Sequence, residues 1–363
     1  MNPSSKLNSQ PKVLDSPLLF TVRAMNKADA VNIVGLIRDS YGNSYFYKQF
    51  YDPGEIISAN EKGYLTSVVA ETNDGEIIGH MALLRTQEDY QVVEPVIAVV
   101  KTGFRNRGVL TELAEYLYIR RKPELFKEVT GIYIPPVTSH TFSQKQVYNS
   151  DFKDCGIWLG YLPDAEFQKL NTTHSQRISL VLTYLYVKQP KRIIIFPPQY
   201  HTDMIVKLFK NLGVSNITCR MPHRHLQNYL KSESIVKIKE SLSLGQTIVK
   251  IVRPGRNIVD EIKAKLKELC SKDISVIHLY LSLNDPSTYY LAPEFEKLGF
   301  FFAGIMPGSA CKDALILQYL NNATIDYTKI SLVTDTAREI LSYVVKQREI
   351  GLTEIKEVSK ERS

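Results

Sequence analysis

The sequence has only four cysteines, and no two of them lie close together in the sequence. Cys155, Cys219, Cys270 and Cys311 lie far apart, and no CxxC pair or Cys/His cluster is present. A disulfide framework needs paired cysteines, and a structural zinc site needs closely spaced thiolate or imidazole ligands. We therefore expect no disulfide scaffold and no metal site, and we expect a reducing, cytoplasmic location.

Long apolar runs are also missing. No stretch approaches the ~20 apolar residues that a membrane-spanning helix needs. The first twelve residues are polar and rich in proline and serine, without the apolar centre of a secretory signal. The sequence therefore predicts no membrane partner and no secretion, and it predicts a disordered tail over residues 1–17.

What is present is the composition of an ordinary globular protein with uneven charge. The 363 residues are 44% hydrophobic, and the length predicts two domains. Residues 1–170 carry 18 Lys and Arg against 20 Asp and Glu, a net charge of −2. Since the whole chain has a net charge of +7, residues 171–363 have a net charge of +9. This basic half is either a solvated surface or a surface for an anionic partner. Because no nucleic-acid-binding motif accompanies the charge, a nucleic-acid partner is not expected.

Hydrophobic periodicity predicts strands and helices in alternation over the first half of the chain. An Asp74-Gly75 turn between two apolar runs predicts a hairpin. Three antiparallel strands followed by a β-α-β-α-β half predict an α/β fold built on a mixed α+β sheet. The expected strands are 18–23, 65–71, 76–85, 92–101, 129–134 and 155–161, and the expected helices are 26–41, 55–62, 110–118 and 139–149.

The second half shows a similar rhythm, which we interpret as a weak internal repeat. The sequence predicts domains over residues 18–165 and 175–325, an amphipathic helix over 328–350 and a charged tail over 351–363. The apolar face of that last helix is expected to pack on either domain or on a second copy in a homodimer. Further expected strands are 179–188, 192–196, 215–220, 246–252, 275–283, 300–305 and 314–319, with helices over 201–211, 257–270 and 289–298.

One stretch carries a candidate ligand site. A β-branched run ends at Val100, a basic loop with Arg105, Arg107 and Gly108 follows, and apolar residues then recur at helical spacing. A strand that enters a helix through a glycine-containing loop presents unpaired backbone N–H groups and the positive end of the helix dipole. The stretch is therefore a candidate pyrophosphate site, with a plain basic surface loop as the alternative.

The sequence Arg105-Asn106-Arg107-Gly108-Val109-Leu110 resembles the Q/R-x-x-G-x-G/A loop of the GNAT superfamily of acyl-CoA-dependent N-acetyltransferases. Leu110 departs from the small residue of that motif, and Asp151 stands where the family usually has glycine. The surrounding context, TVRAMNKADA, DGEIIGHMALLR and HTFSQKQVYNSDFKDCGIWLGYLP, is similar to the family's first strand and helix, central hairpin and last helix with its strand. The C-terminal half resembles a second, degenerate copy, whose loop Arg253–Asn257 lacks the glycine spacing.

The resemblance implies acetyl-CoA, or another acyl-CoA, as cofactor and two tandem units, with catalysis in the first. It implies that backbone N–H groups of Ala98, Val99 and Val100 donate to the carbonyl of the thioester. It places Gln144 near the pantetheine arm or the substrate. It also implies that the pyrophosphate is bound by Arg105, Asn106, Arg107, Gly108, Val109, Leu110 and Thr111.

Acetyl transfer to an amine also needs a base and a proton donor. Glu94 is a candidate base, or else an edge carboxylate paired with a lysine. His80 is a further candidate base or substrate contact, or else a packing residue. Tyr148 or Ser143 are candidate proton donors to the departing thiolate. The aromatic segment of Tyr45, Phe46, Tyr47 and Tyr51 is expected either to cover the acceptor pocket or to form core.

Three functions remain open at this point. The first is an acetyl-CoA-dependent N-acetyltransferase acting by direct attack of a primary amine, whose acceptor is an unidentified small molecule or protein. The second is a non-catalytic acyl-CoA-binding module that regulates or docks a protein. The third, prompted only by the basic half, is a nucleic-acid- or ribosome-associated modifier.

Overall fold

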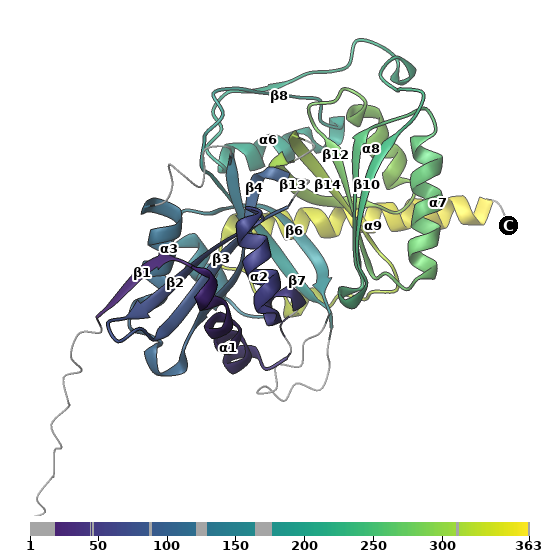
Figure 1. The fold of residues 1–363 in the computed structure, drawn as a ribbon. Coiled ribbons are helices and arrows are strands. Elements are labelled where there is room, and N and C mark those ends of the chain that lie inside the picture. The colour runs from purple at the N-terminus through teal and green to yellow at the C-terminus, as the bar shows by residue number, and fades with distance from the viewer. Residues whose placement is uncertain are drawn as a thin grey trace, which may run out of the picture. The chain divides into compact units, whose positions relative to one another are not determined.

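The computed structural model describes residues 19–43, 45, 47–86, 89–120, 129–163, 176–309 and 312–361 (Figure 1). The tail predicted at residues 1–17 lies outside them. The chain divides into two compact units: unit 1 is residues 1–83 and 96–122, and unit 2 is residues 84–95 and 123–363. This division differs from the predicted domains 18–165 and 175–325, because residues 123–165 cluster with the C-terminal half.

The chain has the predicted mixed α/β fold. Antiparallel strand pairs such as β1–β2 occur together with parallel pairs such as β4–β5 and β11–β12. In unit 1, β1 (Phe20–Ala24), β2 (Leu65–Thr72) and β3 (Ile77–Thr86) are neighbours in that order, and β4 (Asp89–Val100) follows β3. The predicted turn joins β2 to β3, where Gly75 has a φ of 86° that a residue without a Cβ adopts freely.

Helices α1 (Ala30–Tyr41), α2 (Pro53–Glu61) and α3 (Val109–Glu115) complete unit 1. Gly79 on β3 makes room for α3, since a Cβ there would lie 2.9 Å from a Val109 methyl group. The next residue, His80, contacts the ring of Phe50 just before α2, with 6.3 Å between ring centroids. Because neighbouring strand residues face opposite sides, α3 and the Phe50 segment cover opposite faces of β3.

The strands of unit 2 follow the order β4-β5-β7-β6-β13-β14-β12-β11-β10. A separate parallel pair is formed by β8 (Ile193–Ile195) and β9 (Ile217–Cys219). The helices of the unit are α5 (Phe142–Tyr148), α6 (Thr202–Asn211), α7 (Ile258–Ser271), α8 (Thr288–Glu296) and α9 (Asp335–Glu361). The remaining strands are β5 (Gly131–Ile134), β6 (Lys153–Leu162), β7 (Ile178–Tyr186), β10 (Ile235–Ser241), β11 (Gln246–Arg253), β12 (Val276–Ser282), β13 (Phe301–Ser309) and β14 (Lys312–Leu320).

The position of strand β7 in the sheet differs from the one that its order in the sequence suggests. We expected it to open the second domain, but it lies between β5 and β6 and is antiparallel to both. Tyr184 of β7 is opposite Tyr133 of β5, and Leu180 of β7 is opposite Trp158 of β6. These pairings tie residues 123–162 to the C-terminal half.

Two other elements also differ from expectation. Strand β10 was not predicted, because its side chains are mostly exposed and charged, as at Lys237 and Lys239. Helix α9 begins at Asp335 and continues to Glu361, so the predicted helix 328–350 is shifted and the expected charged tail is helical. The helix begins where Thr334 Oγ1 accepts a hydrogen bond from the N–H of Ala337. Its apolar face is buried in unit 2 through Ala337, Ile340 and Val344.

Candidate functional site

The stretch from β4 to α3 has the predicted strand–loop–helix form. β4 ends at Val100, and the N–H of Lys101 donates to the Ile78 carbonyl of β3 at 2.8 Å. The loop then turns through two left-handed residues, Asn106 with φ 60° and Gly108 with φ 81°. The chain thereby reverses and enters α3 directly at Val109.

The first turn of α3 is anchored on one side and open on the other. Val109 is buried against Gly79, whereas Leu110 is 44% exposed. Gly108 at the N-cap supplies no side-chain hydrogen bond to the helix. The first amides of a helix have no acceptor within the helix, so these N–H groups are available to a ligand. Leu110 points outward and does not pack in the core.

Arg105 is held at the base of this loop. Its Nε donates to the Val100 carbonyl at 3.1 Å, and its charge favours the ionised form of the nearby Tyr41 phenol. Burial is nevertheless the larger influence on Tyr41, and its pKa is raised. The structure thus joins two predicted residues, Arg105 and Val100, while Asn106 and Thr111 are exposed on either side of Gly108.

The aromatic segment after α1 lies against β4. The hydroxyl of Tyr45 donates to the Val96 carbonyl, and the ring packs edge-on against Phe50. Tyr45 and Phe50 are almost fully buried, so this part of the segment forms core. Phe46 lies outside the described residues. Sequence inspection had no signal for the Tyr45–Val96 contact, which joins residues 51 positions apart.

His80 is a buried packing residue. The side chain is fully buried, and neither ring nitrogen has a hydrogen-bond partner in the part of the chain that the structure describes. Burial lowers its pKa to about 3, because the imidazolium would lose its hydration. An imidazole that resists protonation this strongly is a poor general base, so the packing alternative is favoured for His80.

Glu94 belongs to unit 2 and is half-buried on β4. Its carboxylate accepts a hydrogen bond from the Tyr133 hydroxyl at 2.6 Å. The contact follows from the parallel register of β4 and β5, in which Val92 pairs with Gly131 and Val93 with Ile132. Among the described residues this pairing does not extend beyond Val93. Tyr133 is the neighbour of Glu94 that sequence inspection missed.

The three predicted residues of α5 have different surroundings. Gln144 is fully buried, and its amide donates to the carbonyls of Val137, His140 and Ser331 at 2.8–3.1 Å. Its oxygen accepts from the N–H of Val333 at 3.2 Å. Gln144 therefore holds backbone segments together, and this occupies both ends of its amide. These hydrogen bonds do not favour the predicted contact between Gln144 and the cofactor.

Tyr148 and Ser143 differ in whether their hydroxyls form hydrogen bonds. The Tyr148 hydroxyl donates to Asp154 at 2.6 Å, and Thr334 donates to the other carboxylate oxygen of Asp154 at 2.5 Å. Burial and the adjacent carboxylate raise the pKa of Tyr148 far above its usual value. Within the described ranges, the buried Ser143 hydroxyl has no partner. The arrangement thus favours Ser143 over Tyr148 as a proton donor.

Two backbone N–H groups of the second loop, Arg253–Asn257, donate to residues 231–234 of the same chain. The N–H of Gly255 donates to Ser234 Oγ at 3.1 Å, and the N–H of Arg256 donates to the Lys231 carbonyl at 3.0 Å. A Cβ at Gly255 would lie 2.5 Å from the Ser234 nitrogen, so residues 231–234 lie directly on the loop. These amides are therefore not available to a phosphate.

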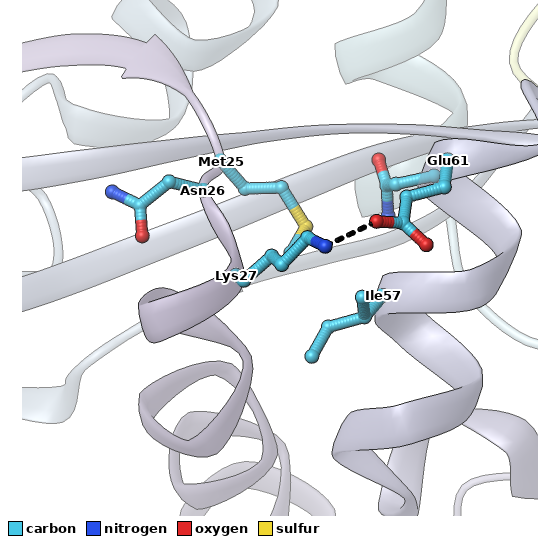
Figure 2. Close-up of a pocket in the computed structure, with 6 residues that line it drawn as sticks. Met25, Asn26, Lys27, Ile57 and Glu61 are labelled. Carbon is cyan, nitrogen blue, oxygen red and sulfur yellow. Dashed lines mark ion pairs between the residues drawn. The ribbon is translucent and has the colours of Figure 1, made fainter.

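A cavity of about 350 Å³ in unit 1 lies between the start of α1 and the end of α2. Figure 2 shows Lys27 pointing toward Glu61, with which it forms an ion pair of 2.6 Å. Asn26 caps the helix start through the N–H of Ala28, and Asn60 donates to the Ile56 carbonyl. These polar groups hold the two helices, and the cavity has no part in the function proposed below.

A search of the described part of the chain finds no cluster of three or more metal-ligating side chains. It also finds no helix that is long and apolar enough to cross a membrane. The predicted site residues are divided between the units. His80, Ala98–Val100 and Arg105–Thr111 belong to unit 1, and Glu94, Ser143, Gln144 and Tyr148 belong to unit 2.

Comparison with known proteins finds similarity only at the level of structure. No model of a protein family matches the chain, and no curated protein matches it. An N-acetyltransferase from Staphylococcus aureus Mu50 is 19% identical, with a TM-score of 0.36, over 47% of this chain and 99% of that chain. A putative acetyltransferase from Salmonella typhimurium, solved with its cofactor acetyl-CoA, is 13% identical, with a TM-score of 0.37, over 47% and 95%.

A third similar structure is a phosphinothricin acetyltransferase from Sinorhizobium meliloti in complex with AcCoA. It is 16% identical, with a TM-score of 0.37, over 47% of this chain and 90% of that chain. All three are acetyltransferases, and the third is named as a member of the GNAT superfamily. Each is covered over nearly its whole length, and each covers about half of this chain.

Proposed function

We propose that the chain is an acyl-CoA-dependent N-acyltransferase that moves an acetyl group from acetyl-CoA to a primary amine. The observation that carries this proposal is the β4–loop–α3 stretch. There a basic loop with left-handed Asn106 and Gly108 leads into a helix whose first amides have no side-chain cap. This arrangement suits the pyrophosphate of a coenzyme A thioester.

The residues present fit an anion of that size. The N–H groups of Gly108, Val109 and Leu110 supply donors, and Arg105 and Arg107 supply positive charge. No other atom lies within 4 Å of where a Gly108 Cβ would be, so the approach to these amides is open. Arg105 is positioned for this role by its hydrogen bond to the Val100 carbonyl.

Acetyl-CoA, when bound, supplies an acetyl thioester. The amine nitrogen forms a bond to the carbonyl carbon, the carbon–sulfur bond breaks, and the sulfur leaves as a thiolate. Backbone N–H groups at Ala98–Val100 would stabilise the charge that develops on the carbonyl oxygen. Glu94 would accept the proton of the amine, with Tyr133 holding its carboxylate. Ser143, whose hydroxyl is unused, is the candidate donor of a proton to the thiolate.

The test is calorimetric titration of the chain with acetyl-CoA. Gly108→Glu puts a carboxylate where the pyrophosphate would lie, and we expect at least 100-fold weaker binding. Gly63→Glu is the matched control, because Gly63 also has a positive φ, 74°, and open space around it, but lies at the end of α2. Equal affinity of the two variants would show that the loop is not the cofactor site.

A second candidate function is a non-catalytic acyl-CoA-binding module. The observation that favours it is the commitment of the Tyr148 hydroxyl to Asp154, which leaves no tyrosine free to protonate a thiolate on α5. Release of free thiol, measured over a panel of small amines, amino sugars and peptides, separates the two functions. Binding of acetyl-CoA without thiol release on any acceptor supports the module.

A further inference from the structure

Two stretches of unit 2 carry basic residues without any acidic ones. Residues 204–232 contain five Lys and Arg and two His but no Asp or Glu, and residues 241–259 contain three Lys and Arg and no Asp or Glu. The structure brings the stretches together. The N–H of Lys231 donates to the Pro254 carbonyl at 3.1 Å, and the N–H of Arg256 donates to the Lys231 carbonyl at 3.0 Å.

The cationic side chains of this region are on the surface. Besides Lys210 on α6, five of them are exposed and form no ion pair within the described residues: Arg220, Arg224, Lys231, Arg253 and Arg256. By contrast, Lys207 of the same acid-free stretch is paired with Glu339 on α9. The carboxylates that border the two stretches are Asp203, Glu233, Glu240 and Asp260, and Asp203 lies close enough to act on Cys219, the residue before Arg220. Positive charge therefore exceeds negative charge across the surface.

Two tyrosine hydroxyls contact the backbone of one of these residues, Arg224. The Tyr290 hydroxyl donates to the Arg224 carbonyl at 3.1 Å, and the Arg224 N–H donates to the Tyr229 oxygen at 3.1 Å. Tyr290 also contacts Tyr289, with 5.1 Å between ring centroids. All three tyrosines are partly exposed. The Arg224 backbone is thus held between Tyr290 of α8 and Tyr229 of the connection between β9 and β10.

We propose that this surface binds single-stranded nucleic acid. The surface is defined as the basic tyrosine surface: Arg220, Arg224, Lys231, Arg253 and Arg256 together with Tyr229, Tyr289 and Tyr290. Exposed cations attract the phosphates, and exposed rings stack on unpaired bases, the two components of single-strand binding sites. An acidic polypeptide would be attracted by the same cations, and the titration with polyglutamate separates it from a nucleic acid. The inference goes beyond the proposed acyl transfer and does not depend on it.

The test is fluorescence anisotropy of a fluorescein-labelled 12-nucleotide RNA of mixed sequence, and of the same DNA sequence, titrated with the full chain. The logarithm of the binding constant should fall with the logarithm of KCl concentration with a slope of up to about −3.5, at ~0.7 for each of five phosphate contacts. The Arg224→Gln, Arg256→Gln double variant should bind at least tenfold more weakly and with a slope closer to −2. Tyr289→Ala should bind about tenfold more weakly with an unchanged slope.

Lys263→Gln, Lys267→Gln is the matched control, since it removes two exposed positive charges from α7 outside the surface. Its affinity should equal that of the parent chain. Circular dichroism and urea unfolding check that every variant keeps its fold. A flat salt dependence, equal loss in the control, or equally tight binding of a duplex or of polyglutamate would overturn the proposal. Preference for RNA or for DNA identifies the natural strand, and tight binding of either supports the proposal.

Discussion

The Tyr148 hydroxyl donates a hydrogen bond of 2.6 Å to the buried carboxylate of Asp154. Thr334, at the start of α9, donates to the other oxygen of the same carboxylate. Through Asp154, Tyr148 therefore connects α5 to the start of β6 and to the residue that precedes α9. The hydroxyl proton of Tyr148 is engaged in this hydrogen bond.

Replacing Tyr148 by phenylalanine tests this role. We expect Tyr148→Phe to lower the free energy of unfolding by about 1–3 kcal/mol, because a buried carboxylate loses one donor. Thiol release from acetyl-CoA should change by less than about twofold. Urea unfolding and a thiol-release assay measure the two effects. A loss of turnover with unchanged stability would instead make Tyr148 the proton donor.

Gln144 should matter for stability and not for cofactor affinity. Gln144→Leu leaves three carbonyls and one N–H without their partner, and we expect a loss of about 2–4 kcal/mol. Gln146→Leu, an exposed position on the same helix, is the control and should be nearly neutral. Urea unfolding compares the variants, and calorimetry should give the same acetyl-CoA affinity for all folded chains. Weaker cofactor binding by folded Gln144→Leu alone would restore its predicted contact.

His80 should tolerate an apolar replacement. Because its ring nitrogens have no hydrogen-bond partner among the described residues, His80→Leu removes a buried polar group that contributes no hydrogen bond. We expect the free energy of unfolding to change by less than about 1 kcal/mol and thiol release to persist. NMR of the imidazole should show no titration between pH 5 and pH 8, since burial lowers its pKa to about 3. A tenfold loss of turnover in a stable variant would contradict this.

Asp29 should make the stability of unit 1 depend on pH in the acid range. Burial alone would raise the pKa of Asp29, but hydrogen bonds from Arg23 and from the Asn26 N–H outweigh it, and the pKa is lowered. The folded chain then binds this proton more weakly than the unfolded chain. The stabilisation is complete above about pH 4 and is lost as the pH falls through the lowered value.

Asp29→Asn should therefore destabilise unit 1 by about 1–3 kcal/mol at pH 7 and flatten its dependence on acid. Hydrogen exchange at β1 and α1 between pH 3 and pH 7 reports this unit by itself. Asp39→Asn, in the following helix α1, is a charge-matched control whose acid dependence should follow the parent chain. An acid dependence in Asp29→Asn as steep as in the parent chain would exclude Asp29 as its source.

Local features were predictable because they depend on neighbouring residues. The predicted helix 26–41 begins at Asn26, whose side chain accepts from the N–H of Ala28 in the 3-10 turn that leads into α1. The Asp-Gly turn, the end of β4 and the start of α3 follow from glycine and apolar spacing in the same way. In each case the residues that form the feature lie within a few positions of one another.

Features that depend on distant residues were not predictable. The insertion of β7 between β5 and β6 depends on pairing of Tyr184 with Tyr133, 51 positions away. The roles of Gln144 depend on Ser331 and Val333, 187 and 189 positions away. The charge of the second half was visible in the sequence, but the joining of Lys231 to Arg256 was not.

The sequence by itself determined the mixed α/β class and the basic strand–loop–helix stretch from Val96 to Leu113, because both arise from local periodicity and local backbone preference. Only the tertiary structure decided which of the predicted polar site residues are already engaged. Long-range hydrogen bonds occupy Gln144, a bond to the buried Asp154 occupies Tyr148, and burial removes His80 from water. Those effects depend on which distant segments pack together, and no short window of sequence contains them.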